Sequence, residues 1–181
     1  SKLENVTCAT CHDPHGDNGI GHQIRSRQPN SDTLANGYRF TGVGTGVVCM
    51  DCHRSRADVR VEINKRVTNS RYGPHHGPQG DLYEGQIAAT FGGAPFRSTQ
   101  HFSFLQDACV TCHMAADTTS ANKYNVGGHT WNMHNDSTSY DNTNGCKTCH
   151  AGKTSFDQFM ADQDYDGDAT IESWQGEVSG C

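Results

Sequence analysis

The chain has 181 residues, a formal net charge of −6 and a hydrophobic fraction of only 33%. This length suits a single domain, but so low an apolar content approaches that of disordered chains, so something besides side chains must complete the core. The acidic charge argues against a nucleic-acid partner, and no run approaches the ~18 apolar residues of a membrane span.

The first predicted element is a short helical turn at CATCH, residues 8–12, and its pattern Cys-x-x-Cys-His occurs four times. The four copies lie at 8–12, 49–53, 109–113 and 146–150. This pattern is the attachment signature of c-type haem, in which two thiols form thioethers with the vinyl groups and the histidine is the proximal iron ligand. The predicted thioether residues are Cys8, Cys11, Cys49, Cys52, Cys109, Cys112, Cys146 and Cys149. The predicted proximal ligands are His12, His53, His113 and His150.

Zinc and redox-active thiols are the alternatives to haem at these motifs. Zinc sites use Cys-x-x-Cys pairs but do not require a histidine directly after the second cysteine. For the histidine content of this chain, four such coincidences have odds of roughly 1 in 10⁵, if positions are independent. A redox-active pair would explain one copy but not four. The sequence therefore predicts four covalent haems, which also supply the missing apolar core.

His15 lies only three residues after His12. Three residues span at most ~11 Å, too little to pass around a porphyrin whose other face His12 already occupies. His15 must therefore bind a different iron or no iron. An iron in another subunit is a candidate.

The segment between the first and third motifs contains two stretches with β-branched, partly alternating patterns. They are GYRFTGVGTGVV (37–48) and ADVRVEINKRV (57–67). In the second stretch, Val59, Val61 and Ile63 would share one face. We expect one or two short hairpins here.

Seven of the 11 histidines lie outside the motifs, and four irons need four further ligands. Methionine is the competing ligand, but we expect a second histidine on every iron and therefore low potentials. His75 and His76 are held between prolines and could bind two haems or one. His101 could reach a neighbouring haem, and the two glycines before His129 permit close approach to a flat ring. The remaining two, which we expect to be solvated, are His22 and His134.

The C-terminal part is predicted to contain two short helices, within TSFDQFMAD (154–162) and IESWQGEV (171–178). Between them, DQDYDGDATIES (162–173) matches the first half of an EF-hand loop, with its closing acid one residue early. A solvated acidic turn is the alternative. The candidate calcium ligands are Asp162, Asp164, Asp166, Asp168 and Glu172.

The setting of the motifs resembles that of the extracellular tetrahaem cytochromes that polymerise into conductive filaments, the cytochrome nanowires. The matching segments are CHDPHG (11–16), PHHGPQ (74–79), DACVTCHM (107–114) and VGGHT (126–130). The resemblance implies a filament of continuously stacked haems. It also implies that His15 binds an iron of the adjacent subunit, that of the third haem or, as the other option, the fourth. The further distal ligands that it implies are His101, His129 and one or both of His75 and His76.

The sequence thus predicts a multihaem cytochrome c: one tetrahaem domain over 1–181, mostly coil, with short helices and short β-hairpins around four haems. Its expected function is extracellular electron transfer without catalysis, because two histidines on each iron leave no position for a substrate. The chain is expected to be exported, with its signal peptide already removed. Identical subunits, other redox proteins and extracellular electron acceptors are the expected partners. A monomeric periplasmic or secreted electron shuttle is the alternative.

Overall fold

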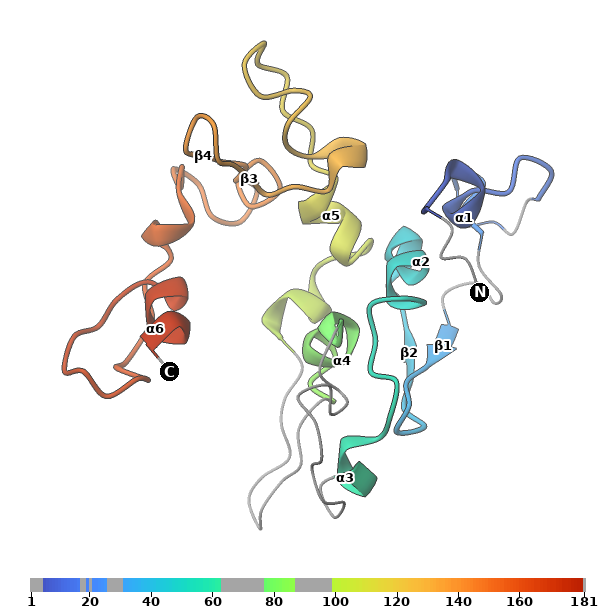
Figure 1. The fold of residues 1–181 in the computed structure, drawn as a ribbon, viewed down its shortest axis with the longest axis horizontal. Coiled ribbons are helices and arrows are strands. Elements are labelled where there is room, and N and C mark those ends of the chain that lie inside the picture. The colour runs from blue at the N-terminus through green and yellow to red at the C-terminus, as the bar shows by residue number, and fades with distance from the viewer. Residues whose placement is uncertain are drawn as a thin grey trace. The chain divides into compact units, whose positions relative to one another are not determined.

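The computed structural model describes residues 5–16, 19, 21–25, 31–62, 77–86 and 99–180. The chain divides into two compact units, Ser1–Ala108 and Cys109–Cys181. Within the described residues most of the backbone is coil and turn, with short helices and two antiparallel sheets of two strands each (Figure 1). This is the sparse secondary structure expected from the sequence. The haems that it is expected to enclose stay a prediction.

The first unit contains the β1–β2 hairpin and a series of short helices. Its elements are α1 (Cys8–Cys11), β1 (Ser31–Thr33), β2 (Arg39–Thr41), the 3-10 helix η1 (Gly44–Gly46), α2 (Val47–Met50), α3 (Val59–Glu62), α4 (Gln79–Tyr83) and the 3-10 helix η2 (Gln100–Ser103). In the hairpin, Asp32 lies opposite Phe40. Phe40 is fully buried together with Val47 and Met50 of α2, so the hairpin and the helix share a small apolar core.

The stretch 37–48 forms a strand only in its first half. Strand β2 pairs with the upstream segment Ser31–Thr33, whereas η1 and α2 follow it. The Asp107 carboxylate accepts hydrogen bonds from the backbone N–H and the hydroxyl of Thr45, both at 2.8 Å. Gly44 has a φ of +51°, a conformation that few other residues adopt. These contacts hold the second half in helical turns despite its β-branched residues.

The strand predicted in 57–67 is wrong over the described part, because Val59–Glu62 forms the short helix α3. The Asp58 carboxylate accepts a hydrogen bond from the Arg60 backbone N–H at 2.9 Å and also binds the Arg60 guanidinium. Such a local side-chain contact favours a helical start over a strand. Val61 is 55% exposed, so it does not lie on a buried face. Residues 63–67 lie outside the described residues.

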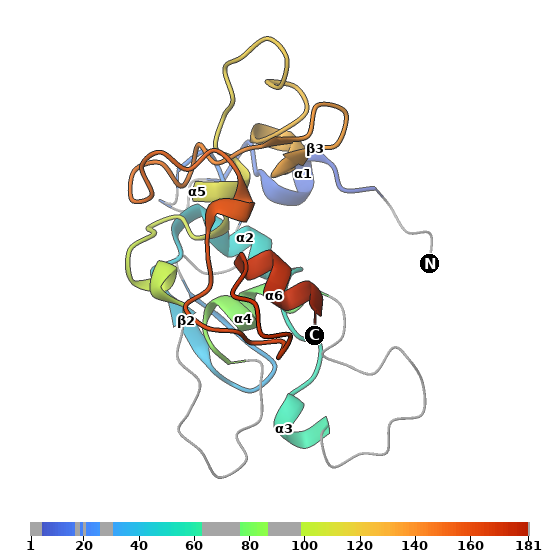
Figure 2. The same ribbon diagram turned by 90° about the vertical axis from the view of Figure 1, so that its left-hand side faces the viewer.

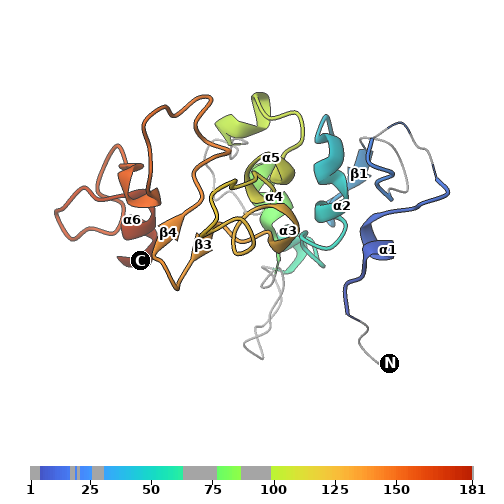
Figure 3. The same cartoon turned by 90° about the horizontal axis from the view of Figure 1, so that it is seen from above.

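The second unit contains α5 and a small hairpin, followed by a helical C-terminal part. Its elements are α5 (Cys109–His113), the 3-10 helix η3 (Gly128–Thr130), β3 (His134–Asn135), β4 (Tyr140–Asp141), the 3-10 helix η4 (Phe156–Gln158) and α6 (Trp174–Gly180). The strands β3 and β4 are antiparallel neighbours, visible from above in Figure 3. Both predicted C-terminal helices are confirmed, as η4 and as α6, which is drawn in red in Figure 2.

Polar side chains fill much of the interior of the second unit. Asn142 is fully buried and donates to the Ala115 carbonyl at 2.8 Å, and buried Asn135 donates to Asn122 at 2.9 Å. Gly127 packs so closely that a Cβ would collide with the same Ala115 carbonyl. The glycines before His129 therefore have different roles: Gly127 packs against backbone, whereas a Cβ at Gly128 would meet no atom within 4 Å.

No helix among the described residues is long and apolar enough to cross a membrane.

Candidate haem-binding site

Each of the four Cys-x-x-Cys-His motifs contains a short helical or hydrogen-bonded turn. The first and third form α1 and α5, the second begins inside α2, and the fourth is a run of turns. In the first, second and fourth motifs the histidine N–H donates to the carbonyl of the first cysteine, at 2.8, 2.8 and 2.7 Å. The predicted helical turns are thus present, and none of the eight motif cysteines forms a disulfide in this structure.

Three of the four motif histidines have their Nδ1 atom hydrogen-bonded to an oxygen that can only accept. The contacts are His12 Nδ1 to His22 O at 2.8 Å, His53 Nδ1 to Gln79 Oε1 at 3.1 Å and His113 Nδ1 to Trp131 O at 3.0 Å. Because the acceptor is an amide oxygen in each case, Nδ1 carries the proton. Nε2 is then left with its lone pair, as a metal-binding imidazole requires.

Two of these anchoring carbonyls belong to residues with a left-handed backbone. His22 has a φ of 51° and Trp131 a φ of 57°. This conformation costs a non-glycine residue about 1–2 kcal/mol, and it occurs most often where a functional geometry requires it. Neither anchor could be predicted, because a backbone carbonyl has no signature in the amino-acid sequence.

The fourth motif histidine, His150, packs edge-to-face against Phe159, with ring centroids 5.2 Å apart. The Lys153 ammonium lies 5.9 Å from the centre of the same Phe159 ring. Phe159 follows η4 directly, so the predicted helix in 154–162 orients this histidine.

Within the first unit, the first two motifs lie close together through Cys11 and Cys52. Burial raises the pKa of the Cys11 thiol, and the neighbouring sulfurs of Cys52 and Cys8 raise it further. A raised thiol pKa is the opposite of what a redox-active Cys-x-x-Cys pair needs.

Within the second unit, the third and fourth motifs meet in the same way. Burial raises the pKa of the Cys112 thiol, followed by the effects of Cys146 and Cys109, and the Cys112 and Cys146 thiols are in hydrogen-bonding contact. Gly145 permits this approach, because a Cβ there would lie 2.9 Å from the Cys112 Cα. The second unit therefore brings the cysteines of two motifs into contact, and in the first unit Cys11 and Cys52 are close enough to interact electrostatically.

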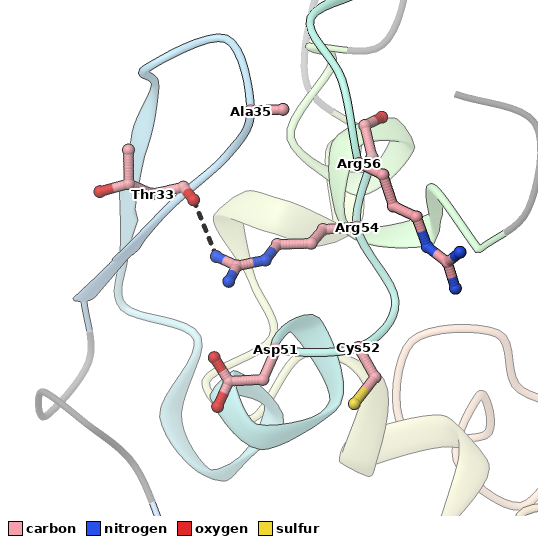
Figure 4. A pocket seen from close by; sticks show the side chains of 7 residues that line it. Thr33, Ala35, Asp51, Cys52, Arg54 and Arg56 are labelled. Atoms are coloured by element: carbon pink, nitrogen blue, oxygen red, sulfur yellow. Dashed lines mark hydrogen bonds between the residues drawn. The ribbon is translucent and has the colours of Figure 1, made fainter. Parts of the chain in front are cut away.

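A cavity of about 540 Å³ opens beside the second motif (Figure 4). Its lining consists of Thr33, Ala35, Asp51, Cys52, Arg54, Ser55 and Arg56. The Arg54 guanidinium donates to the Thr33 carbonyl at 2.8 Å, whereas the Arg56 side chain points away from it. The cavity thus borders a sulfur that is a predicted thioether position.

The predicted distal histidines are exposed where they are described. His15 lies on the turn after α1, where its N–H donates to Asp13 at 3.1 Å. His101 lies in η2, and its carbonyl accepts from the Tyr83 hydroxyl at 3.2 Å. His129 lies in η3. The remaining two candidates, His75 and His76, lie outside the described residues.

His22 and His134, which the sequence analysis left as solvated side chains, both have specific contacts. His22 supplies the carbonyl that binds His12. His134 lies in β3, where its Nδ1 is 2.6 Å from Asp141 Oδ1. Only the exposure of these side chains agrees with the expectation.

The acidic loop brings three of its five candidate calcium ligands together. Asp164, Asp166 and Asp168 present oxygen atoms within 4.8 Å of one another. Asp162 lies outside this group and accepts from the Tyr165 hydroxyl at 2.8 Å. Glu172 also lies outside it. Calcium binding by this loop stays a prediction.

Glu177 of α6 contacts this loop, and sequence reasoning missed it. It is almost fully buried in α6, and its carboxylate accepts from the backbone N–H groups of Tyr165 at 2.7 Å and Glu172 at 2.9 Å. These backbone hydrogen bonds lower its pKa. Glu177, and not Glu172, is the acid that closes the loop, and it does so through the backbone.

Comparisons with protein-family models, curated proteins and solved structures found no match to this chain.

Proposed function

We propose that this protein is a tetrahaem c-type cytochrome that transfers electrons outside the cytoplasm and assembles into a filament. The observation that carries the proposal is the repeated Cys-x-x-Cys-His turn, in which the histidine Nδ1 is held by a fixed acceptor at three of the four copies. A zinc site would require further ligands around each pair, whereas one haem requires two thiols and an oriented imidazole.

The composition of the interior supports large apolar cofactors. Among the described residues only nine hydrophobic side chains are buried, and two of them are alanines. Large rings lie on the surface instead, with Phe104 at 73% and Tyr124 at 77% exposure. Haem faces would supply the apolar surface that the interior lacks.

The pairing of motifs inside each unit supports electron transfer between haems. Haems bonded to Cys11 and Cys52, or to Cys112 and Cys146, would be attached at neighbouring sulfurs. The bound haem supplies one-electron chemistry at iron. The chain holds the cofactors at a fixed spacing and keeps each imidazole oriented.

Assembly is proposed to depend on His15. Its turn is held by the Asp13 carboxylate and by a hydrogen bond from the Gln23 side chain to the Pro14 carbonyl at 3.1 Å. The side chain is exposed on this stiffened turn. Since it is too close in sequence to His12 to bind the same iron, an iron of another subunit is its proposed partner.

The test compares His15→Ala with His15→Met in the secreted holoprotein. We expect His15→Ala to retain four covalent haems by mass and to lose filaments by electron microscopy, with one haem gaining a position that binds carbon monoxide. His15→Met keeps a side chain that can ligate iron, so it is expected to retain filaments and to raise the potential of one haem.

Three results would contradict different parts of this proposal. A wild-type mass without four haems would exclude the cytochrome. Ordered fibres from His15→Ala would exclude ligation between subunits, and a wild-type protein that stays monomeric with every iron six-coordinate would indicate an electron shuttle.

A further inference from the structure

The β3–β4 hairpin holds His134 against Asp141. The two residues are opposite each other in the strand register, and His134 Nδ1 lies 2.6 Å from Asp141 Oδ1. The second oxygen of Asp141 accepts from the Ser155 hydroxyl and the Phe156 backbone N–H, both at 2.8 Å. The carboxylate is therefore fixed on both sides, and it fixes the ring in turn.

The protonation of this pair follows from its contacts. Asp141 Oδ1 lies 2.6 Å from His134 Nδ1, and Asp141 Oδ2 accepts from the Ser155 hydroxyl and the Phe156 N–H. An aspartate carboxylate that already accepts two hydrogen bonds acts as an acceptor towards the ring as well. Nδ1 of His134 carries the proton, which leaves Nε2 as the nitrogen with a lone pair when the ring is neutral.

The arrangement matches that of the motif histidines. His12, His53 and His113 also have Nδ1 bound to a fixed oxygen, at 2.8, 3.1 and 3.0 Å. A carboxylate in this position is a recurrent support of metal-binding histidines, because it sets the tautomer and raises the basicity of the ligating nitrogen. The side chain of His134 is 44% exposed, so its outer edge is accessible to a large cofactor.

An ion pair within the hairpin is the competing explanation. Asp136 lies 3.7 Å from His134 Nε2, which is too long for a hydrogen bond, and its side chain is fully exposed. An exposed pair of this kind contributes little to stability. It does not explain why a second, largely buried carboxylate fixes the other nitrogen.

The small number of histidines in the second unit also favours His134 as a metal ligand. Cys109–Cys181 contains two motifs and, besides their own histidines, only His129 and His134. If both haems of this unit are six-coordinate, His129, His134 and the partner subunit's His15 are three candidate ligands for two positions.

We propose that His134 is an iron ligand, binding one of the two haems of the second unit through Nε2, with Asp141 as its positioning residue. This inference rests on the proposed haem attachment. It has a consequence for assembly: one of His129 and the partner subunit's His15 then has no iron to bind in this unit.

The experiment uses the holoprotein with His134→Ala, and Asp136→Asn as a matched control. We expect His134→Ala to keep four haems by mass, while one haem per chain becomes high-spin and binds carbon monoxide after reduction. Added imidazole should restore the low-spin spectrum by occupying the vacated position. Asp136→Asn removes the other carboxylate beside the ring and should leave the spectrum unchanged.

Asp141→Asn tests the positioning role. The haem should stay low-spin, but its midpoint potential should rise. An amide oxygen accepts the Nδ1 hydrogen bond more weakly than a carboxylate does, so it raises the basicity of the ligating nitrogen less. A purely structural ion pair would leave every potential unchanged.

The outcomes separate this inference from the proposed function. Four haems that all stay low-spin in His134→Ala would overturn the ligand assignment and leave the cytochrome intact. If His134→Ala fails to fold, His134→Met decides: one haem with the spectrum of histidine–methionine ligation supports the assignment, and four unchanged haems overturn it. Wild-type protein without covalent haem would instead remove the premise.

Discussion

Glu84 is a carboxyl group that the structure buries without full hydrogen bonding. Its side chain is only 2% exposed, and Oε1 has no hydrogen-bond partner in the structure. Oε2 accepts from the Tyr38 hydroxyl at 3.2 Å. Burial raises the pKa of Glu84 to about 7, and the hydrogen bond from Tyr38 opposes this rise only in part.

The free energy of unfolding should therefore decrease as the pH rises and Glu84 ionises. The folded state holds the proton up to pH about 7, whereas the unfolded state releases it near 4.5, the usual pKa of a glutamate side chain. Between these two values the folded state binds more protons, so the free energy of unfolding decreases as pH rises, by up to about 3 kcal/mol. The loss is complete above the folded-state pKa. Glu84→Gln cannot ionise, so denaturant unfolding from about pH 5 to about pH 8 should show no such fall.

Tyr38→Phe is the matched variant for this measurement. It removes the hydrogen bond that lowers the pKa of Glu84 and changes the shape of the site little. The fall in stability should then extend to higher pH than in the wild type. Parallel stability profiles for wild type and Glu84→Gln would show that Glu84 is not protonated in the folded protein.

At the scale of elements, the β3–β4 hairpin contains a conformation that its residue does not favour. Ser139 has a φ of 48° in the turn between the strands and is exposed. A left-handed backbone costs a non-glycine residue about 1–2 kcal/mol, whereas glycine adopts it freely but loses more entropy on folding. Ser139→Gly should therefore raise the free energy of unfolding by about 1 kcal/mol, measured by urea denaturation.

Ser137 provides the control in the same turn. It is also exposed, but its φ is not positive. Ser137→Gly should lower the free energy of unfolding by about 0.5–1 kcal/mol, because only the entropy cost remains. Equal effects of the two substitutions would contradict the strain assigned to Ser139.

The elements differ in how far the sequence could predict them. The Cys-x-x-Cys-His turns were predictable because the proposed thioethers and iron bond would fix residue type and spacing together. α3 was not, because its valine alternation implied a strand while Asp58 formed a local helical start. The anchors of the motif histidines were also unpredictable, since His22 and Trp131 act through their carbonyls. His134 was missed for a related reason: its carboxylate partner is seven residues away and meets it only through the strand pairing.

At the scale of the whole molecule, few apolar side chains are buried in the part of the chain that the structure describes. The second unit places Asn142, Asn135 and Glu177 in its interior, where each is satisfied by hydrogen bonds. Such contacts specify a conformation but contribute only about 0.5–1.5 kcal/mol each. Ordering a residue costs about 1–2 kcal/mol of backbone entropy, so these contacts alone do not stabilise a chain of this length.

The protein without its attachment cysteines should therefore not fold. We expect a variant with all eight motif cysteines replaced by serine to show no cooperative urea transition and to be cleaved rapidly by a broad-specificity protease. Serine keeps the size and polarity of the thiol but cannot form a thioether, so the loss would reflect the missing cofactors and not altered packing. The wild-type holoprotein, measured in parallel, should unfold cooperatively. A cooperative transition in the serine variant would mean that the polypeptide forms its own core, and the proposed role of haem as the interior of this molecule would be wrong.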